Sequence, residues 1–329
     1  MAQEPIKLKI NKAPPFLSWQ VPTESIPEYL DINEKDRENE QCAASLYEAL
    51  RFGTHILNWL RMEYRGSYTG KATSMLFAEQ LRKLDALYAL FKSGAQASAP
   101  ILIRSMTETL LYFKYIFNED SERRAKSILF MGKIRRLDFL KELQESTPSG
   151  KQVRDLLSLD AMGINFSLGG DGIPDEIKQI NMQLSSEFAD ILAEYESRNK
   201  PDPDRWYRLF GGPNELRKLA ENVEETGVYY MCYRSFNEHI HGTHVFREEK
   251  YWSKPGASKF SVRPLKANPL FDESFFVMIR SFMVALDHVH INRPVLRDWF
   301  FSCKLLALRG FENFTMSGPD GKKHDIELS

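Results

Sequence analysis

The segment from Pro100 to Phe117, PILIRSMTETLLYFKYIF, constrains the fold more than any other part of the chain. Proline suits the first turn of a helix, and the residues that follow are apolar almost all the way round. A helix of this kind lies in the middle of a bundle, so other segments must cover it. Two charged residues interrupt its first half, Arg104 and Glu108. A charge inside a bundle is costly unless it has a partner, so the presence of these two residues needs an explanation. Both are therefore candidates for a functional role.

Helical periodicity also dominates the rest of the chain. Apolar residues recur at intervals close to 3.6, and no region has the alternation of a strand. Further helices are expected over residues 44–64, 71–92, 121–144, 174–197, 215–222, 226–241 and 272–291, with one more after Pro294. These expectations define an all-α fold, a helical bundle with an extended N-terminal arm and a loop or short hairpin before the C-terminal helices.

The distribution of proline predicts the domain organisation. Five of the 16 prolines lie within the first 27 residues, and the next is Pro100. Proline removes a backbone donor and disfavours helix interiors, so residues 1–33 are expected to form an extended arm. Residues 34–312 are expected to form one helical domain, and residues 313–329 a polar C-terminal tail.

Composition excludes several classes of protein. Three cysteines without a C-x-x-C pair indicate neither a disulfide framework nor a thiolate zinc site. The N-terminus lacks the apolar region of a signal peptide, and Arg104 and Arg280 interrupt the most hydrophobic segments. A cytoplasmic protein that does not contact a membrane is expected.

The charge balance limits how the chain binds a polyanion. The 44 basic residues almost equal the 45 acidic ones, so attraction of the whole molecule to nucleic acid is not expected. The helix expected over 121–144 is nevertheless rich in Lys and Arg. It is either a local RNA contact or a solvated helix face.

The densest polar cluster is YYMCYRSFNEHIHGTH at residues 229–244. On a regular α-helix, Arg234 and His241 differ in direction by only about 20°, and Asn237 lies between them on the same side. Gly242 is a helix stop, which places His241 in the last turn, where the helix dipole favours the imidazolium. A histidine beside an arginine suits proton transfer next to a phosphate. In the alternative reading, His241 only caps the helix.

Two further interpretations of the polar residues stay open. His241 and His244 have a spacing that suits a shared metal, but no correctly placed third ligand follows, so neither a metal nor a cofactor is expected. Arg104 and Glu108 form either a structural salt bridge or the polar lining of a cavity. The residues predicted for that cavity are Arg104, Glu108, Tyr112, Tyr230 and His239.

Two blocks of the sequence, APILIRSMTETLLYFKYIF and WYRLFGGPNELRKLAENVEETGVYYMCYRSFNEHIHG, resemble the bacterial family called domain of unknown function 5677. That family is expected to have an Arg-x-x-x-Glu helix, here Arg104 and Glu108. It is also expected to have a helix that ends in His-Gly, here His241 and Gly242. Asn237 stands where serine is usual. The resemblance covers roughly residues 45–245.

The spacing of Arg234 and His241 is similar to the Arg-x(4 to 6)-His motif of HEPN domains, which are common in bacterial toxins and phage defence. The resemblance implies a metal-independent endoribonuclease that acts as a homodimer. His241 would accept the proton of the 2′-hydroxyl, Arg234 would stabilise charge on the phosphate, and Asn237 would orient one of them. Ser235 stands where active members often have Asn, Asp or His.

Two other functions compete with the ribonuclease hypothesis. One is a non-catalytic helical scaffold that binds a protein partner through its N-terminal arm. The other is a sensor in which Arg104 and Arg234 bind an anionic nucleotide in a cavity of the bundle.

Overall fold

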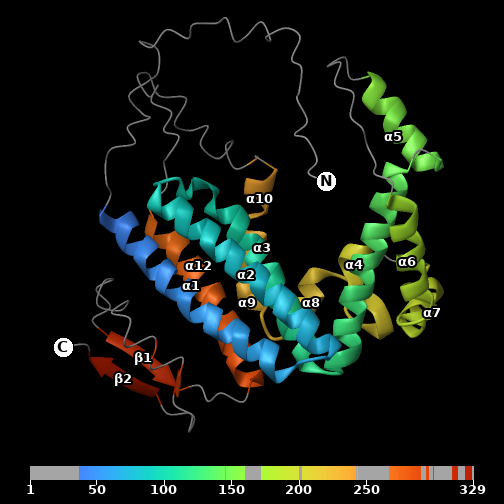
Figure 1. Ribbon diagram of the computed structural model, residues 1–329. Helices are drawn as coiled ribbons and strands as arrows, with labels where there is room; N and C mark the ends of the chain where they lie inside the picture. Colours follow the sequence, from blue (N-terminus) through green and yellow to red (C-terminus); the bar gives the residue numbers. More distant parts are fainter. Residues whose placement is uncertain are drawn as a thin grey trace, which may run out of the picture.

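The computed structural model describes residues 37–144, 146–159, 172–199, 202–241, 243, 267–289, 294–295, 299, 313–317 and 323–327. The predicted N-terminal arm and the loop or hairpin expected before the last helices lie outside these ranges, as does most of the helix expected after Pro294. The fold is predominantly α-helical, as predicted (Figure 1). Within the described residues, no helix is both long and apolar enough to cross a membrane.

The first core is a four-helix group around the apolar helix at its centre. The helices are α1 (Arg37–Glu63), α2 (Tyr68–Lys92), α3 (Ala99–Asn118) and α12 (Ala267–His288). Figure 1 shows them side by side, and α3 packs against both α2 and α12. Phe77, Phe113 and Phe282, from three of these helices, are almost completely buried in this core. The prediction that the 100–117 segment lies inside a bundle is therefore confirmed.

A second core lies on the other side of α3. It is formed by α4 (Ser121–Leu143), α6 (Ile173–Ser185), α7 (Ala189–Ser197), the 3-10 segment η5 (Pro203–Gly211) and α8 (Leu216–Asn222). Phe130, Phe188 and Trp206 are its largest buried side chains. The helix expected over 174–197 is interrupted between α6 and α7, where Phe188 turns into this core. The further helix α5 (Pro148–Leu159) extends beyond α4 (Figure 1).

A short β-hairpin near the C-terminus is an addition to the predicted fold. Strands β1 (Asn313–Ser317) and β2 (Lys323–Glu327) pair antiparallel, with Asn313 opposite Glu327 (Figure 1). They lie in the segment that was expected to be only a polar tail. Two strands do not change the fold class, which is determined by the helices.

The helix expected over 226–241 is broken into three pieces. α9 (Thr226–Val228) leads into a π-helix, η6 (Tyr229–Arg234), and a turn separates η6 from α10 (Asn237–Ile240). The prediction of one regular α-helix is therefore wrong. A π-helix has more residues per turn than an α-helix, and such segments are frequent at functional sites.

A buried carboxylate fixes the start of this broken helix. Glu225, directly before α9, has only 2% of its surface exposed. Its Oε1 accepts hydrogen bonds from Lys114 Nζ of α3 at 2.8 Å and from Arg280 Nη2 and Nε of α12 at 2.6 and 3.0 Å. These bonds join the two helices of the first core to the segment that precedes η6.

Glu225→Ala should lower the free energy of unfolding by about 3 kcal/mol, because it leaves two cations without their buried partner. This value is at the low end of the usual range, since the side chains of Lys114 and Arg280 are 29% and 33% exposed. Urea denaturation measures the change. The control is Glu224→Ala at the exposed neighbouring position, with an expected change within about 0.5 kcal/mol. Equal effects of the two substitutions would contradict the prediction.

Candidate functional site

The segment from η6 to α10 is anchored by one apolar side. Val228, Cys232 and Phe236 are buried in the first core, four residues apart. Ile240, four residues after Phe236, is instead 41% exposed, because the chain no longer follows a single α-helix there. The anchors determine which residues face outward.

Arg234, Asn237 and His241 are all exposed on this segment. The predicted alignment of Arg234 and His241 within about 20° assumed a regular α-helix, and η6 and the turn after it remove that basis. The Arg234 guanidinium lies 5.4 Å from the centre of the Tyr230 ring, and within the described residues it forms no ion pair. The backbone N–H of His241 donates to the carbonyl of His239, so His241 occupies the C-cap of α10.

Arg104 of α3 contacts the inner side of η6. Its Nη2 donates to the hydroxyl of Tyr233 at 2.7 Å, and its guanidinium carbon lies 4.1 Å from the centre of that ring. Tyr233 in turn stacks on Tyr229, with ring centres 5.2 Å apart. The described contacts include no ion pair between Arg104 and Glu108, so the structural salt bridge is not formed. The Nε atom of Arg104 is buried without a hydrogen-bond partner.

Glu108 is surrounded by tyrosines. The Tyr112 hydroxyl donates to Glu108 Oε1 at 2.6 Å. Burial, and then the carboxylate of Glu108, hold the pKa of Tyr112 well above its usual range. The same two causes raise the pKa of Tyr233, and burial raises the pKa of Tyr207 to about 12. These phenols therefore stay protonated at neutral pH, and each can donate one hydrogen bond, as Tyr112 does to Glu108.

The structure divides the predicted cavity residues. Arg104, Glu108 and Tyr112 lie together beside η6. Tyr230 is 37% exposed and lies with Arg234, while the His239 ring is 5.8 Å from Phe236. Tyr207 was not predicted for the site, although its ring centre is 5.9 Å from that of Tyr112. The aromatic run WYRLF at 206–210 was the available signal.

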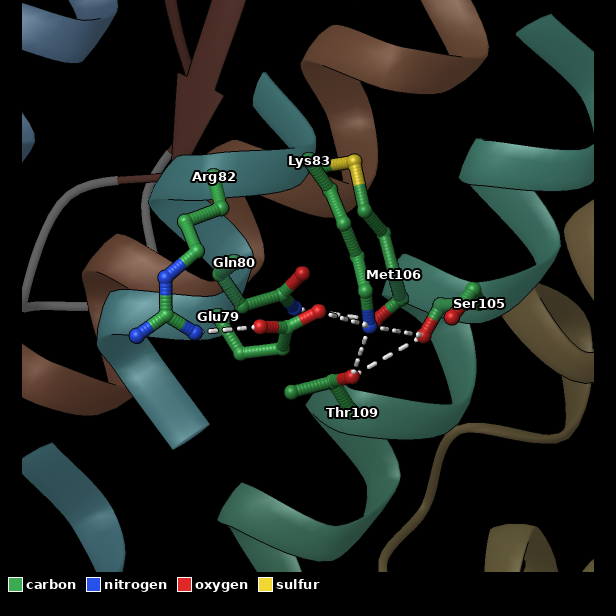
Figure 2. A network of polar contacts seen from close by, with 7 residues as sticks. All are labelled: Glu79, Gln80, Arg82, Lys83, Ser105, Met106 and Thr109. Carbon is green, nitrogen blue, oxygen red and sulfur yellow. Dashed lines mark hydrogen bonds and ion pairs between the residues drawn. The ribbon is translucent and has the colours of Figure 1, made fainter. Parts of the chain in front are cut away.

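Hydrogen bonds on another side of α3 fix its register against α2 (Figure 2). Lys83 Nζ donates to Thr109 Oγ1 at 2.8 Å and to the Ser105 carbonyl at 3.2 Å, and burial lowers the pKa of Lys83. Gln80 Nε2 donates to the Met106 carbonyl at 2.9 Å and to Ser281 Oγ of α12 at 3.0 Å. α3 therefore holds Arg104 and Glu108 on a rigid support.

The basic residues of α4 are mostly neutralised by neighbouring side chains. All seven have an acidic or amide partner, and several of the partners come from α6 and α7. The pairs are Arg123 with Asp120, Arg124 with Glu119, Lys126 with Asp190, Lys133 with Gln183, Arg135 with Asp204, Arg136 with Glu176 and Lys141 with Asp138. This pattern favours the solvated-face interpretation of α4 over a continuous RNA contact.

The described residues contain no group of three His, Cys, Asp or Glu side chains placed to hold a metal ion. His244 and Gly242 lie outside the described residues, so the shared-metal interpretation of His241 and His244 stays untested. The side chains gathered around η6 supply cations, phenol donors, a carboxylate and an imidazole. Such a set suits proton transfer and the binding of an anion.

Comparison with protein-family models identifies one match, over residues 71–256. The chain belongs to the family of unknown function DUF5677. The match includes the α3 residues, η5, η6 and α10, and it confirms the family predicted from the sequence. The matched segment begins at residue 71, where the sequence predicted about 45, and ends at residue 256, where the sequence predicted about 245. Neither the curated proteins nor the solved structures contain a match to the chain.

Glu273 of α12 generates a prediction about pH. Burial raises its pKa to about 7, and it lies near Cys232 of η6, whose own pKa is raised by burial and by Glu273. The pKa of glutamate in an unfolded chain is about 4.3. Between these values the native state keeps a proton that the unfolded state releases, so stability should fall as pH rises from about 4.3 to 7.

Glu273→Gln should remove this loss, because glutamine stays neutral at every pH. The urea midpoint of this variant should therefore exceed that of the wild type, by a difference that grows as the pH is raised from 4.5 to 8. Glu196→Gln, at an exposed position of α7, is the matched control and should leave the pH profile unchanged. Parallel profiles for the wild type and Glu273→Gln would contradict the prediction.

Proposed function

We propose that this member of the DUF5677 family is a HEPN-like, metal-independent endoribonuclease. The observation that supports the proposal is the outward position of Arg234, Asn237 and His241 on the η6 to α10 segment. Arg234 has no acidic partner among the described residues, so its guanidinium is available to a phosphate. The proposal also follows from the resemblance of the Arg234 and His241 spacing to the HEPN motif.

The proposed reaction is an internal transesterification of RNA. His241 accepts the proton of a 2′-hydroxyl, and the 2′-oxygen attacks the adjacent phosphorus. The bond from phosphorus to the 5′-oxygen breaks, and that oxygen takes up a proton as it leaves. The products are a 2′,3′-cyclic phosphate and a free 5′-hydroxyl. Arg234 stabilises the negative charge on the phosphoryl oxygens, and Asn237 orients the reacting groups.

A homodimer fits this chemistry. One histidine does not easily act as base and acid in the same cleavage, whereas two facing copies supply both. Three apolar side chains near the proposed catalytic residues are exposed: Tyr230 at 37%, Met231 at 56% and Ile240 at 41%. Apolar groups grouped at a surface favour contact with another protein, and a second copy would bring its own Arg234 and His241 to the same place.

His241→Ala should lower the rate of RNA cleavage by about 100-fold to 10,000-fold, the usual contribution of a general base. Arg234→Ala should lower it by about 100-fold to 1,000-fold. Cleavage is measured on a labelled single-stranded RNA, and the cyclic phosphate is identified by mass spectrometry. Growth arrest on induced expression should disappear with the same substitutions if the enzyme is a toxin or a defence effector.

The matched control is His55→Ala, which removes an exposed histidine of α1 far along the chain from the site. It should leave cleavage unchanged. Light scattering of the full chain gives the oligomeric state. Equal cleavage by the wild type and by His241→Ala would disprove the proposed reaction.

A further inference from the structure

A polar cleft lies on the α4 side of the molecule, with Tyr207 in its wall. Its volume is about 630 Å³, and it is bounded by the end of α3, the start of α4, η5, the turn after η5, and α8. This volume lies within the usual range of small-molecule sites, about 300 to 1,000 Å³. Neither Arg234 nor His241 lines it.

The lining of this cleft is positively charged. Arg123, Arg124 and Lys218 line it with one carboxylate, Glu119. Arg124 is held in place: its Nη1 donates to the Tyr115 carbonyl at 2.7 Å, its Nη2 donates to Glu119 at 3.1 Å, and its guanidinium carbon lies 3.8 Å from the centre of the Tyr115 ring. A fixed guanidinium at a cleft wall is suited to a phosphate, because its donors match the oxygens in pairs.

The other two cations are held only by exposed ion pairs. Arg123 contacts Asp120 at 2.6 Å, and Lys218 contacts Glu221 at 2.9 Å. The side chains of Arg123 and Lys218 are 47% and 52% exposed. Exposed pairs contribute little to stability, so an anionic ligand can replace these carboxylates at small cost.

The backbone at the rim of the cleft has an unusual conformation. Phe210 and Gly211 both have positive φ angles, 54° and 75°. The backbone N–H of Phe210 donates to Glu194 Oε1 at 2.8 Å. A Cβ atom on Gly212 would lie 1.9 Å from the Tyr207 carbonyl oxygen. Only glycine therefore allows the turn after η5 to pack this closely against the backbone of Tyr207. A non-glycine residue held in the left-handed region is frequent at ligand sites.

The walls of the cleft also supply aromatic groups and a free donor. Phe210 is 36% exposed, and the Arg123 guanidinium lies 4.6 Å from the centre of its ring. Trp206, another lining residue, has a buried indole N–H that lacks a hydrogen-bond partner in the structure. Buried donors without a partner are uncommon, and this one belongs to a residue that lines the cleft.

We infer that this cleft binds a phosphorylated ligand of nucleotide size. Arg123, Arg124 and Lys218 bind its phosphate, and Phe210 contacts its planar ring. The ligand is either a free nucleotide or a nucleotide unit of RNA, which present the same phosphate and base. This site is separate from the Arg234 and His241 segment, so it does not depend on the proposed ribonuclease activity.

The test measures binding to the full chain by isothermal titration calorimetry. The ligands are adenosine 5′-monophosphate, adenosine without phosphate, and an eight-nucleotide single-stranded RNA. We expect adenosine monophosphate to bind at least about tenfold more tightly than adenosine. The double variant R123Q/K218Q should weaken binding by about tenfold or more, because it removes two charged donors.

R135Q is the matched control, since Arg135 is an equally exposed residue of α4 that is paired with Asp204 and does not line the cleft. It should leave binding unchanged, and circular dichroism confirms that each variant is folded. Binding of only the RNA, with the same dependence on Arg123 and Lys218, supports the site and assigns it to RNA. Absence of binding by both phosphorylated ligands, or equal binding by the wild type and R123Q/K218Q, would overturn the inference.

The same titrations on His241→Ala keep the two proposals apart. Binding in the cleft should be retained in that variant, because His241 does not line the cleft. Loss of cleavage with retained binding supports both proposals. Retained binding without any cleavage by the wild type overturns only the ribonuclease.

Discussion

The carboxylate of Glu225 connects the parts of the molecule that the candidate site requires. Lys114 and Arg280 are more than 150 residues apart in the sequence, and both donate to the same oxygen. Removing the carboxylate from water costs free energy, and charged hydrogen-bond donors must offset that cost. The π-helix begins four residues later, so this acceptor helps to fix the position of its start relative to α3.

The same requirement explains the tyrosines around α3. An apolar central helix that carries Arg104 and Glu108 needs polar partners for both side chains. η6 supplies Tyr233 for the arginine, and α3 itself supplies Tyr112 for the carboxylate. Phenols suit this task because they contribute apolar surface as well as a hydrogen-bonding group. The polar residues of α3 are thereby joined to the segment that bears Arg234.

Sequence periodicity was enough to predict the helices whose apolar residues repeat regularly. The 100–117 and 121–144 segments match α3 and α4 to within a few residues, because burial of a regular stripe determines a regular helix. The π-helix was not predictable in this way. Its stripe at Val228, Cys232 and Phe236 also fits an α-helix, and its contacts with residues distant in the sequence, such as that of Tyr233 with Arg104, leave no trace in the periodicity. Tyr207 likewise joins the site only through tertiary packing.

The position of α12 has a consequence for how the chain folds during synthesis. Phe282 packs against Phe52 and Phe77, so the first core contains residues from both sides of the 71–256 segment that defines the family. A growing chain that has passed the last family residue still lacks the helix that covers α1 and α3. The faces of α1 and α3 that α12 covers therefore stay open until α12 itself has left the ribosome, so this core closes only after the whole family segment has been synthesised.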